Sequence, residues 1–127
     1  MQELDVFYDR FGAPIVRLLD NGRLVNFQGQ SLGFVDGVLL YNYQGVHVGW
    51  LENGVIRDLN GLTVAFGENP LDAPIPYLPY RQYKPYPAYV EYEPYRPYRQ
   101  YPSYKPYKLY GWSALTPTQL FKGQNNG

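Results

Sequence analysis

Residues 29–66 read GQSLGFVDGVLLYNYQGVHVGWLENGVIRDLNGLTVAF. Short segments of β-branched, aliphatic and aromatic residues alternate in this stretch with glycines and with Asp36-Gly37 and Asn53-Gly54. Asp-Gly and Asn-Gly favour two-residue hairpin turns, because a type I′ turn needs positive φ at both central positions. The glycines recur too closely for a helix of ordinary length. The stretch therefore predicts consecutive antiparallel hairpins.

The hairpins form a repeat that extends towards the N-terminus. Gly12, Gly29, Gly45 and Gly61 are separated by 17, 16 and 16 residues. One hairpin cannot bury its apolar face alone, whereas several that close on one another can. We expect a mainly β head over residues 1–67, an antiparallel meander of eight short strands in four glycine-turn β-hairpin repeats with a pseudo-four-fold arrangement. The expected bulky core or inter-repeat positions are Phe27, Phe34, Tyr41, Trp50 and Phe66.

A tyrosine ladder follows a proline-rich linker over residues 68–76. Tyrosine occupies every third position of residues 77–110, and Pro, Lys, Arg, Gln and Glu fill most positions between. A period of three is that of polyproline II, which places all the rings along one edge of an extended tail. The ladder consists of Tyr77, Tyr80, Tyr83, Tyr86, Tyr89, Tyr92, Tyr95, Tyr98, Tyr101, Tyr104, Tyr107 and Tyr110.

The tail is too long to lie straight beside the head. At about 3.1 Å per residue a polyproline II segment of this length spans roughly 105 Å, whereas a head of this size is only about 30 Å across. The tail must wrap, hang free or engage other subunits, and in the isolated chain it could also be disordered. Residues 1–76 carry a net charge of −5 and residues 77–110 a net charge of +4, so head and tail attract, within one chain or between neighbours.

The C-terminal residues 111–127 form a compact apolar element. Its apolar side chains are Trp112, Leu115, Leu120 and Phe121. Residues 116–119 read TPTQ, a capping box with proline at the first helical position, which predicts a helical turn over 117–122 that ends at Gly123. Residues 123–127 are expected to be a frayed end. The element either plugs the head of its own chain or anchors on a neighbour.

Several segments resemble a known bacterial family, the four-fold β-flower domain. The resemblance is carried by FYDRFGAPI at 7–15, LGFVDG at 32–37, VGWLENG at 48–54, VIRDLNGLTVAF at 55–66 and GWSALTPTQLF at 111–121. It covers nearly the whole chain and implies the four-fold hairpin fold with a terminal Trp-Ser motif. Members of the family also carry a period-three linker, Val-Lys-Pro-like where this chain is rich in tyrosine. The family has no assigned activity, so the resemblance supplies no catalytic residues.

The residues themselves predict no catalytic, cofactor or metal site. His47 is the single histidine, and a lone histidine on a strand is more often structural than a ligand or base. Cysteine is absent, which excludes disulfides and thiolate metal sites from this chain. The acids Asp9, Asp20, Asp36, Glu52 and Asp58 lie mostly at turns, where local hydrogen bonding explains them.

Location and partners are only weakly constrained. The N-terminus does not resemble a signal peptide, and no apolar run approaches the roughly 20 residues of a membrane span. We expect a cytoplasmic protein by default, with non-classical export to the cell surface as an alternative. Residues 76–81 and 94–99 match the PxxPxR pattern of proline-groove ligands, as any period-three Pro/Arg repeat does. No nucleic acid partner is expected.

A structural role is the function that the sequence favours. An exposed row of aromatic rings usually marks an interaction surface, and rings from a second tail can pack between them. We expect a non-catalytic protein that assembles into a filament or homo-oligomer through the tyrosine ladder and the C-terminal element. The alternative is a binding module whose Tyr/Pro/Arg ridge recognises a polysaccharide or a protein partner.

Overall fold

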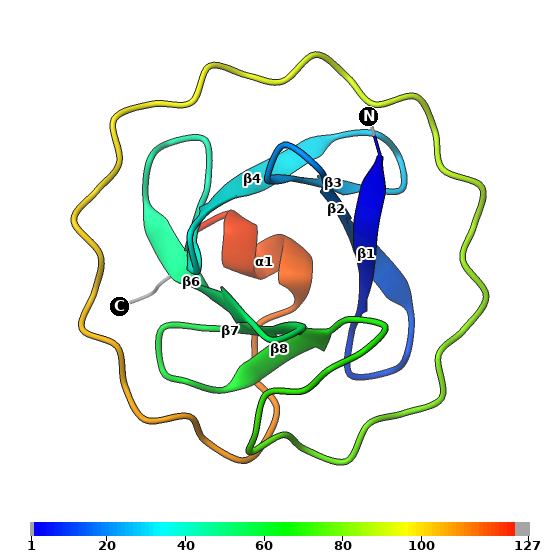
Figure 1. Cartoon of the computed structure of the whole chain (residues 1–127), viewed down its shortest axis with the longest axis vertical. Helices are drawn as coiled ribbons and strands as arrows, with labels where there is room; N and C mark the ends of the chain where they lie inside the picture. The colour runs from blue at the N-terminus through cyan, green and yellow to red at the C-terminus, as the bar shows by residue number, and fades with distance from the viewer. Residues whose placement is uncertain (1, 124–127) are drawn as a thin grey trace.

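The protein is a closed eight-stranded β-barrel encircled by its own tail, as a computed structural model describes it over residues 2–123. Each strand pairs antiparallel with the next, and the last pairs with the first (Figure 1). This confirms the predicted mainly β meander of four hairpins. The strands are β1 (Glu3–Tyr8), β2 (Pro14–Leu19), β3 (Arg23–Asn26), β4 (Ser31–Asp36), β5 (Leu39–Tyr41), β6 (His47–Glu52), β7 (Val55–Arg57) and β8 (Thr63–Phe66).

One loop design recurs at four equivalent places and sets the repeat. An aspartate or asparagine lies at the end of a strand or directly after it, and its Oδ1 accepts two backbone N–H groups of the following loop. Asn42, for example, accepts from Gln44 and Val46 at 3.0 Å each. A glycine three residues on then donates its N–H back to the carbonyl, as Gly45 does to Asn42 at 3.0 Å. The four residues that begin these loops are Asp9, Asn26, Asn42 and Asp58.

Side chains alternate between the inside and the outside of the barrel along each strand, and both sets are buried. Phe7 points into the barrel and belongs to the inner core, while its neighbours Val6 and Tyr8 belong to a separate outer cluster. The five aromatic residues expected in the core are all buried. Tyr8, Phe27 and Phe66 belong to the outer cluster. Phe34 and Trp50 occupy the positions equivalent to Phe66 in their own hairpins, so they also lie on the outer face of the barrel. Apolar side chains on the outside of the barrel must be shielded from water by another segment.

The C-terminal element fills one end of the barrel of its own chain. Helix α1 (Pro117–Phe121) lies at the centre of the ring of strands (Figure 1), with Leu120 and Phe121 in the inner core. The predicted capping box is present, since Gln119 N donates to Thr116 Oγ1 and Thr116 N donates to Gln119 Oε1. A Cβ added to Gly33 would lie 2.2 Å from the carbonyl oxygen of Tyr41 on the neighbouring strand and 2.8 Å from Cδ1 of Phe121, so strand pairing and the plug both require a glycine there.

The described structure ends shortly after the plug. Helix α1 is one residue shorter than the predicted 117–122 and is followed by Gly123 with positive φ. The rest of the predicted frayed end, residues 124–127, lies outside the described residues. Trp112 packs on the outer cluster, with its ring centroid 6.1 Å from that of Phe66.

Residues 77–110 form neither helix nor strand. They run once around the barrel as a scalloped ring (Figure 1), so of the three arrangements open to the tail the structure has the wrapped one. The polyproline II conformation of its backbone stays a prediction. Over residues 2–123, no helix is long and apolar enough to cross a membrane.

The plug yields a stability prediction. Phe121→Ala removes a ring that is 4% exposed and leaves a cavity inside the barrel, so we expect a loss of about 3–5 kcal/mol in the free energy of unfolding. Urea denaturation followed by circular dichroism measures it. Thr118→Ala on the exposed side of the same helix is the control, expected to stay within about 0.5 kcal/mol of wild type. Equal effects of the two variants would contradict the plug.

Candidate functional site

The tail is held on the barrel at four equivalent points. The backbone N–H groups of Gln82, Glu91, Gln100 and Leu109 donate to the carbonyl oxygens of Gly12, Gly29, Gly45 and Gly61, at 2.8, 2.9, 2.7 and 3.0 Å. We call the four tail residues the anchor residues and the four glycines the glycine seats. Anchor residues recur every nine residues, whereas the seats recur every 16 or 17. Nine residues of extended tail thus span one hairpin repeat of the barrel.

The seats must be glycine for two reasons. Each has a φ between 81° and 88°, a region that L-residues with a side chain seldom adopt. In addition, a tail carbonyl rests directly on each seat, and a Cβ added there would lie 1.9–2.4 Å from it. The carbonyls belong to Tyr80, Tyr89, Tyr98 and Tyr107. Tail and barrel backbone are therefore in direct contact four times around the ring.

Anchor side chains strengthen this attachment by accepting a hydrogen bond from the backbone N–H of the first residue of the next strand. Glu91 Oε2 accepts the N–H of Ser31 at 2.8 Å, and Gln100 Oε1 accepts that of His47 at 2.9 Å. Pro14 holds the equivalent position in the first repeat and has no N–H to donate. There Gln82 donates from Nε2 to the carbonyl of Phe11 instead, at 3.0 Å.

Charge and aromatic contacts supplement the backbone bonds. Tail bases pair with head acids, as in Lys84–Glu68 at 3.2 Å and Arg99–Asp36 at 3.4 Å. Ion pairs as exposed as these each contribute little to the stability of the fold. The guanidinium carbon of Arg99 also lies 5.1 Å from the ring centroid of Phe34. The attraction expected between head and tail thus operates within one chain.

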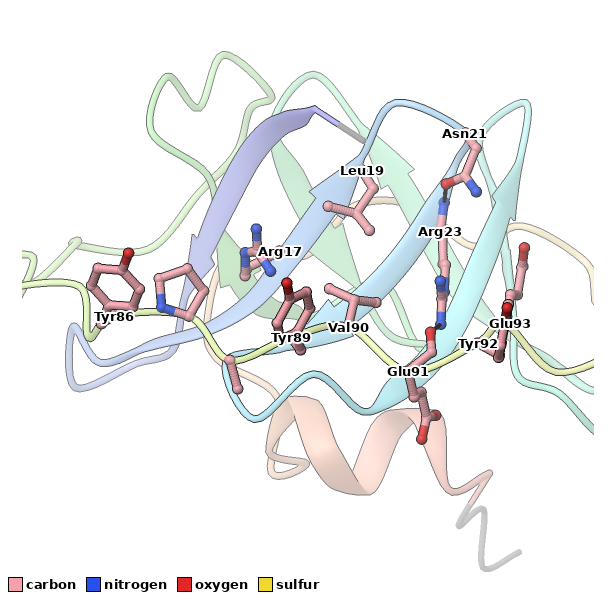
Figure 2. A pocket seen from close by; sticks show the side chains of 12 residues that line it. Arg17, Leu19, Asn21, Arg23, Tyr86, Tyr89, Val90, Glu91, Tyr92 and Glu93 are labelled. Atoms are coloured by element: carbon pink, nitrogen blue, oxygen red, sulfur yellow. Dashed lines mark hydrogen bonds between the residues drawn. The ribbon is translucent and has the colours of Figure 1, made fainter.

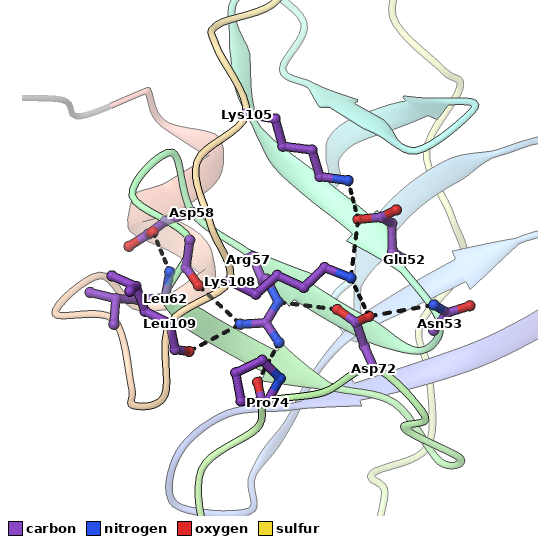
Figure 3. Close-up of polar contacts among 11 residues, drawn as sticks. Glu52, Asn53, Arg57, Asp58, Leu62, Asp72, Pro74, Lys105, Lys108 and Leu109 are labelled. Carbon is purple, nitrogen blue, oxygen red and sulfur yellow. Dashed lines mark hydrogen bonds and ion pairs between the residues drawn. The ribbon is translucent and has the colours of Figure 1, made fainter.

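One ion-pair network is buried, and it joins the linker to the barrel (Figure 3). Arg57 Nε donates to Asp72 Oδ2 at 3.1 Å, and Lys108 Nζ lies 2.6 Å from Asp72 Oδ1. Burial disfavours the ionised Asp72, but the hydrogen bonds from Lys108 and Arg57 outweigh it and lower the pKa of that carboxyl. The carboxylate therefore stays charged and holds both ends of the tail near each other.

All twelve tyrosines of the ladder point away from the barrel, and we call them the tyrosine girdle. Their exposed fractions range from 74% for Tyr110 to 100% for Tyr83. The reason is the register, since an anchor every nine residues leaves every third position free to face solvent. The other predicted site residues lie elsewhere. Leu120 and Phe121 are inside the barrel, Leu115 packs against them and Trp112 packs on the outer cluster.

His47 is a structural residue beneath the tail. It is buried, and its Nδ1 accepts the backbone N–H of Ser103 at 3.0 Å. Burial lowers the pKa of the imidazole, with a smaller opposing effect from the backbone of Gly49. Its neutral form is thus the one that holds the tail. In the part of the chain that the structure describes, no three metal-binding side chains gather into a cluster.

The family described as 4-fold beta flower protein matches residues 5–121. The chain is a member of the 4-fold beta flower family. No curated protein and no solved structure matches it. In this beta flower protein the match spans the barrel, the encircling tail and the plug.

Sequence reasoning missed the anchor residues of the beta flower. It found the period of three in the tail and the period of 16–17 in the head, but not the correspondence between them. The available signal was the polar series Gln82, Glu91 and Gln100 at an interval of nine. Because the anchor interval of nine is a multiple of three, the tyrosines keep the same outward phase in every repeat.

One glycine seat, Gly29, and one glycine outside the seats, Gly37, give a matched pair of alanine variants that tests the seat contact. Gly29 and Gly37 both have positive φ, 83° and 65°, but a Cβ on Gly37 would meet nothing within 4 Å. Either alanine variant costs about 1–2 kcal/mol for its backbone conformation. Gly29→Ala must also displace the Tyr89 carbonyl, which adds about 1–3 kcal/mol. Amide exchange at Glu91 should accelerate in Gly29→Ala and stay unchanged in Gly37→Ala. Equal exchange in both would refute the seat.

The lowered pKa of the His47 imidazole predicts that the stability of the fold depends on pH. Because its folded pKa lies below the unfolded value of about 6.5, the unfolded chain binds the proton first as pH falls. Stability is then fully present above about pH 6.5 and declines as pH falls toward the folded pKa. Thermal unfolding between about pH 5 and pH 7 should show this slope in wild type and a smaller one in His47→Gln. Identical slopes would exclude His47 as the source.

Proposed function

We propose that this protein is a non-catalytic structural module that associates with copies of itself through the tyrosine girdle. The observation that carries the proposal is the outward orientation of all twelve rings on a backbone pinned to the barrel. A monomer that exposes so much contiguous aromatic surface is unusual, and such surfaces commonly mark sites of association. Aromatic rings at regular spacing can pack in offset or edge-to-face contacts with those of a neighbour.

The arrangement favours contact between girdles rather than exchange of tails. The tail backbone is bonded to its own glycine seats, and the C-terminal element is buried in its own barrel. The rings are therefore the part of the tail left for a neighbour. A circular girdle is convex, so any one neighbour meets only a few rings while other rings remain available. This supports an open assembly such as a filament, built from weak repeated contacts.

The alternative is a binding module. The first PxxPxR match is poorly presented to a proline groove, because Pro76 is buried and Arg81 lies 5.5 Å from the ring centroid of Phe66. A polysaccharide that stacks its sugar rings on exposed tyrosines fits the same girdle. The proposal keeps the cytoplasmic location expected from the sequence, which imaging of a tagged full-length chain tests.

Substitution within the girdle tests self-association. We expect concentration-dependent association of the full-length protein in sedimentation velocity, and assemblies by negative-stain electron microscopy. Tyr→Ser at positions 95, 98, 101 and 104 should weaken association while leaving thermal unfolding unchanged, since these rings are 89–96% exposed. Tyr→Phe at the same four positions is the matched control, expected to keep association because it retains the rings.

Point variants are preferable here to removal of the tail, which would uncover buried aromatic residues such as Phe34 and Trp50. A wild-type protein that stays monomeric at its highest soluble concentration would contradict the proposal. If that monomer bound a soluble polysaccharide and the serine variant did not, the girdle would be a binding surface for sugars.

A further inference from the structure

The four-fold pattern is broken at one place, where the tail passes over β2 and β3. In two of the repeats the residue before an anchor is an arginine over a barrel aromatic, Arg81 on Phe66 and Arg99 on Phe34. Val90 precedes the anchor Glu91, and Arg17 occupies the barrel position equivalent to Phe34 and Phe66. At this point the basic residue, Arg17, is on the barrel and the apolar residue, Val90, is on the tail. The tail leaves a space between itself and the barrel wall there.

A cavity of about 880 Å³ lies at this point, between the outer face of β2 and β3 and tail residues 86–93. Its volume falls within the range of small-molecule sites, roughly 300–1,000 Å³. Figure 2 shows Arg17, Leu19 and Arg23 on the barrel wall and the tail running in front of them. The pairing of Arg17 with Val25 and of Leu18 with Leu24 puts those three side chains on one face.

Arg23 carries a buried charge without a direct counter-ion. Its side chain is 4% exposed and donates from Nη2 to Ser31 Oγ at 2.7 Å and to the carbonyl of Glu91. Among residues 2–123 no carboxylate lies within ion-pair distance of it, and its Nε has no hydrogen-bond partner. A buried charge without a paired counter-charge is unfavourable, because its lost hydration is not replaced.

The same protein shows how a buried guanidinium is normally satisfied. Arg57 is 3% exposed, and it pairs with the carboxylate of Asp72 and donates to three backbone carbonyls (Figure 3). Arg23 has two acceptors, and both are uncharged. The contrast shows that Arg23, unlike Arg57, lacks a directly paired carboxylate, although Glu91 and Glu93 lie within coulombic reach of it.

The acids that line the cavity are bound to other groups. Glu91 Oε2 accepts the N–H of Ser31, and Glu93 Oε2 accepts from Tyr43 and from Arg96. Arg17 is paired through Nε with Glu3 at 2.8 Å, and its guanidinium carbon lies 5.9 Å from the ring centroid of Phe27. Both guanidinium groups line one cavity, and among the described residues Nε of Arg23 has no hydrogen-bond partner.

We propose that this cavity binds a small organic anion, with a carboxylate or phosphate head and a short apolar body. The head pairs with the guanidinium of Arg23, and Arg17, diagonal to it on the neighbouring strand, adds a second positive charge. Guanidinium groups recognise both head groups through paired N–H donors. The apolar body lies along Leu19, Ala88 and Val90, which line the same cavity. Three girdle residues, Tyr86, Tyr89 and Tyr92, also line the cavity, so the site adjoins the girdle but does not require self-association.

Titration of the full-length protein tests the proposal. Sodium butyrate and phenyl phosphate are the two probes, each at constant ionic strength, with binding followed by calorimetry and by the Arg23 Nε–Hε resonance. We expect saturable binding of at least one probe and a shift of that resonance. Butyrate alone would identify a carboxylate site and phenyl phosphate alone a phosphate site. No saturable binding of either would overturn the proposal.

Three variants locate the site. Arg23→Gln should weaken binding at least tenfold. Arg99→Gln, a matched control that removes the same charge from the tail outside the cavity, should leave binding unchanged. Val90→Phe fills the cavity without altering a charge and should block binding even if Arg23→Gln fails to fold. Equal loss in Arg23→Gln and Arg99→Gln, or full binding in Val90→Phe, would show that the anions bind only through general charge.

Discussion

The structure depends on the contact between the tail backbone and the four glycine seats. At each seat the absence of a Cβ allows a tail carbonyl to rest on the barrel and an anchor N–H to bond the glycine carbonyl. These are backbone interactions, so they do not depend on which side chains the tail carries between its anchors. The tail is thereby free to carry tyrosine at every third position without loss of its attachment.

The encircling tail also solves a problem of size. A barrel of about 65 residues is near the lower limit for a stable single core. Here the inside is filled by a helical turn of the same chain and the outside is covered by the tail, so both faces of one sheet are buried. In the predicted polyproline II conformation the tail is roughly 105 Å long and would close into a ring about 33 Å across, close to the roughly 30 Å expected of the head.

The two proposals arise from opposite sides of the tail. Its outer side presents the girdle, which repeats every three residues and so offers many similar contacts. Its inner side follows the barrel with a period of nine, and the cavity occurs where that match is imperfect, at Val90 and Arg17. Repetition suits association with many copies, whereas a single break in the repetition suits one specific ligand.

The sequence by itself determined the eight strands, the four-fold repeat and the capped C-terminal turn. These follow from local chemistry, namely the φ that glycine permits, the hydrogen bonds of Asp and Asn at turns, and the capping box. The even spacing of the tyrosines likewise placed them on one side of the tail. Tertiary structure alone decided that Phe34, Trp50 and Phe66 lie on the outer face of the barrel, that the tail covers that face and that the plug enters its own barrel. It also decided that Arg23 is buried without a directly paired carboxylate, because burial depends on which segments meet in space.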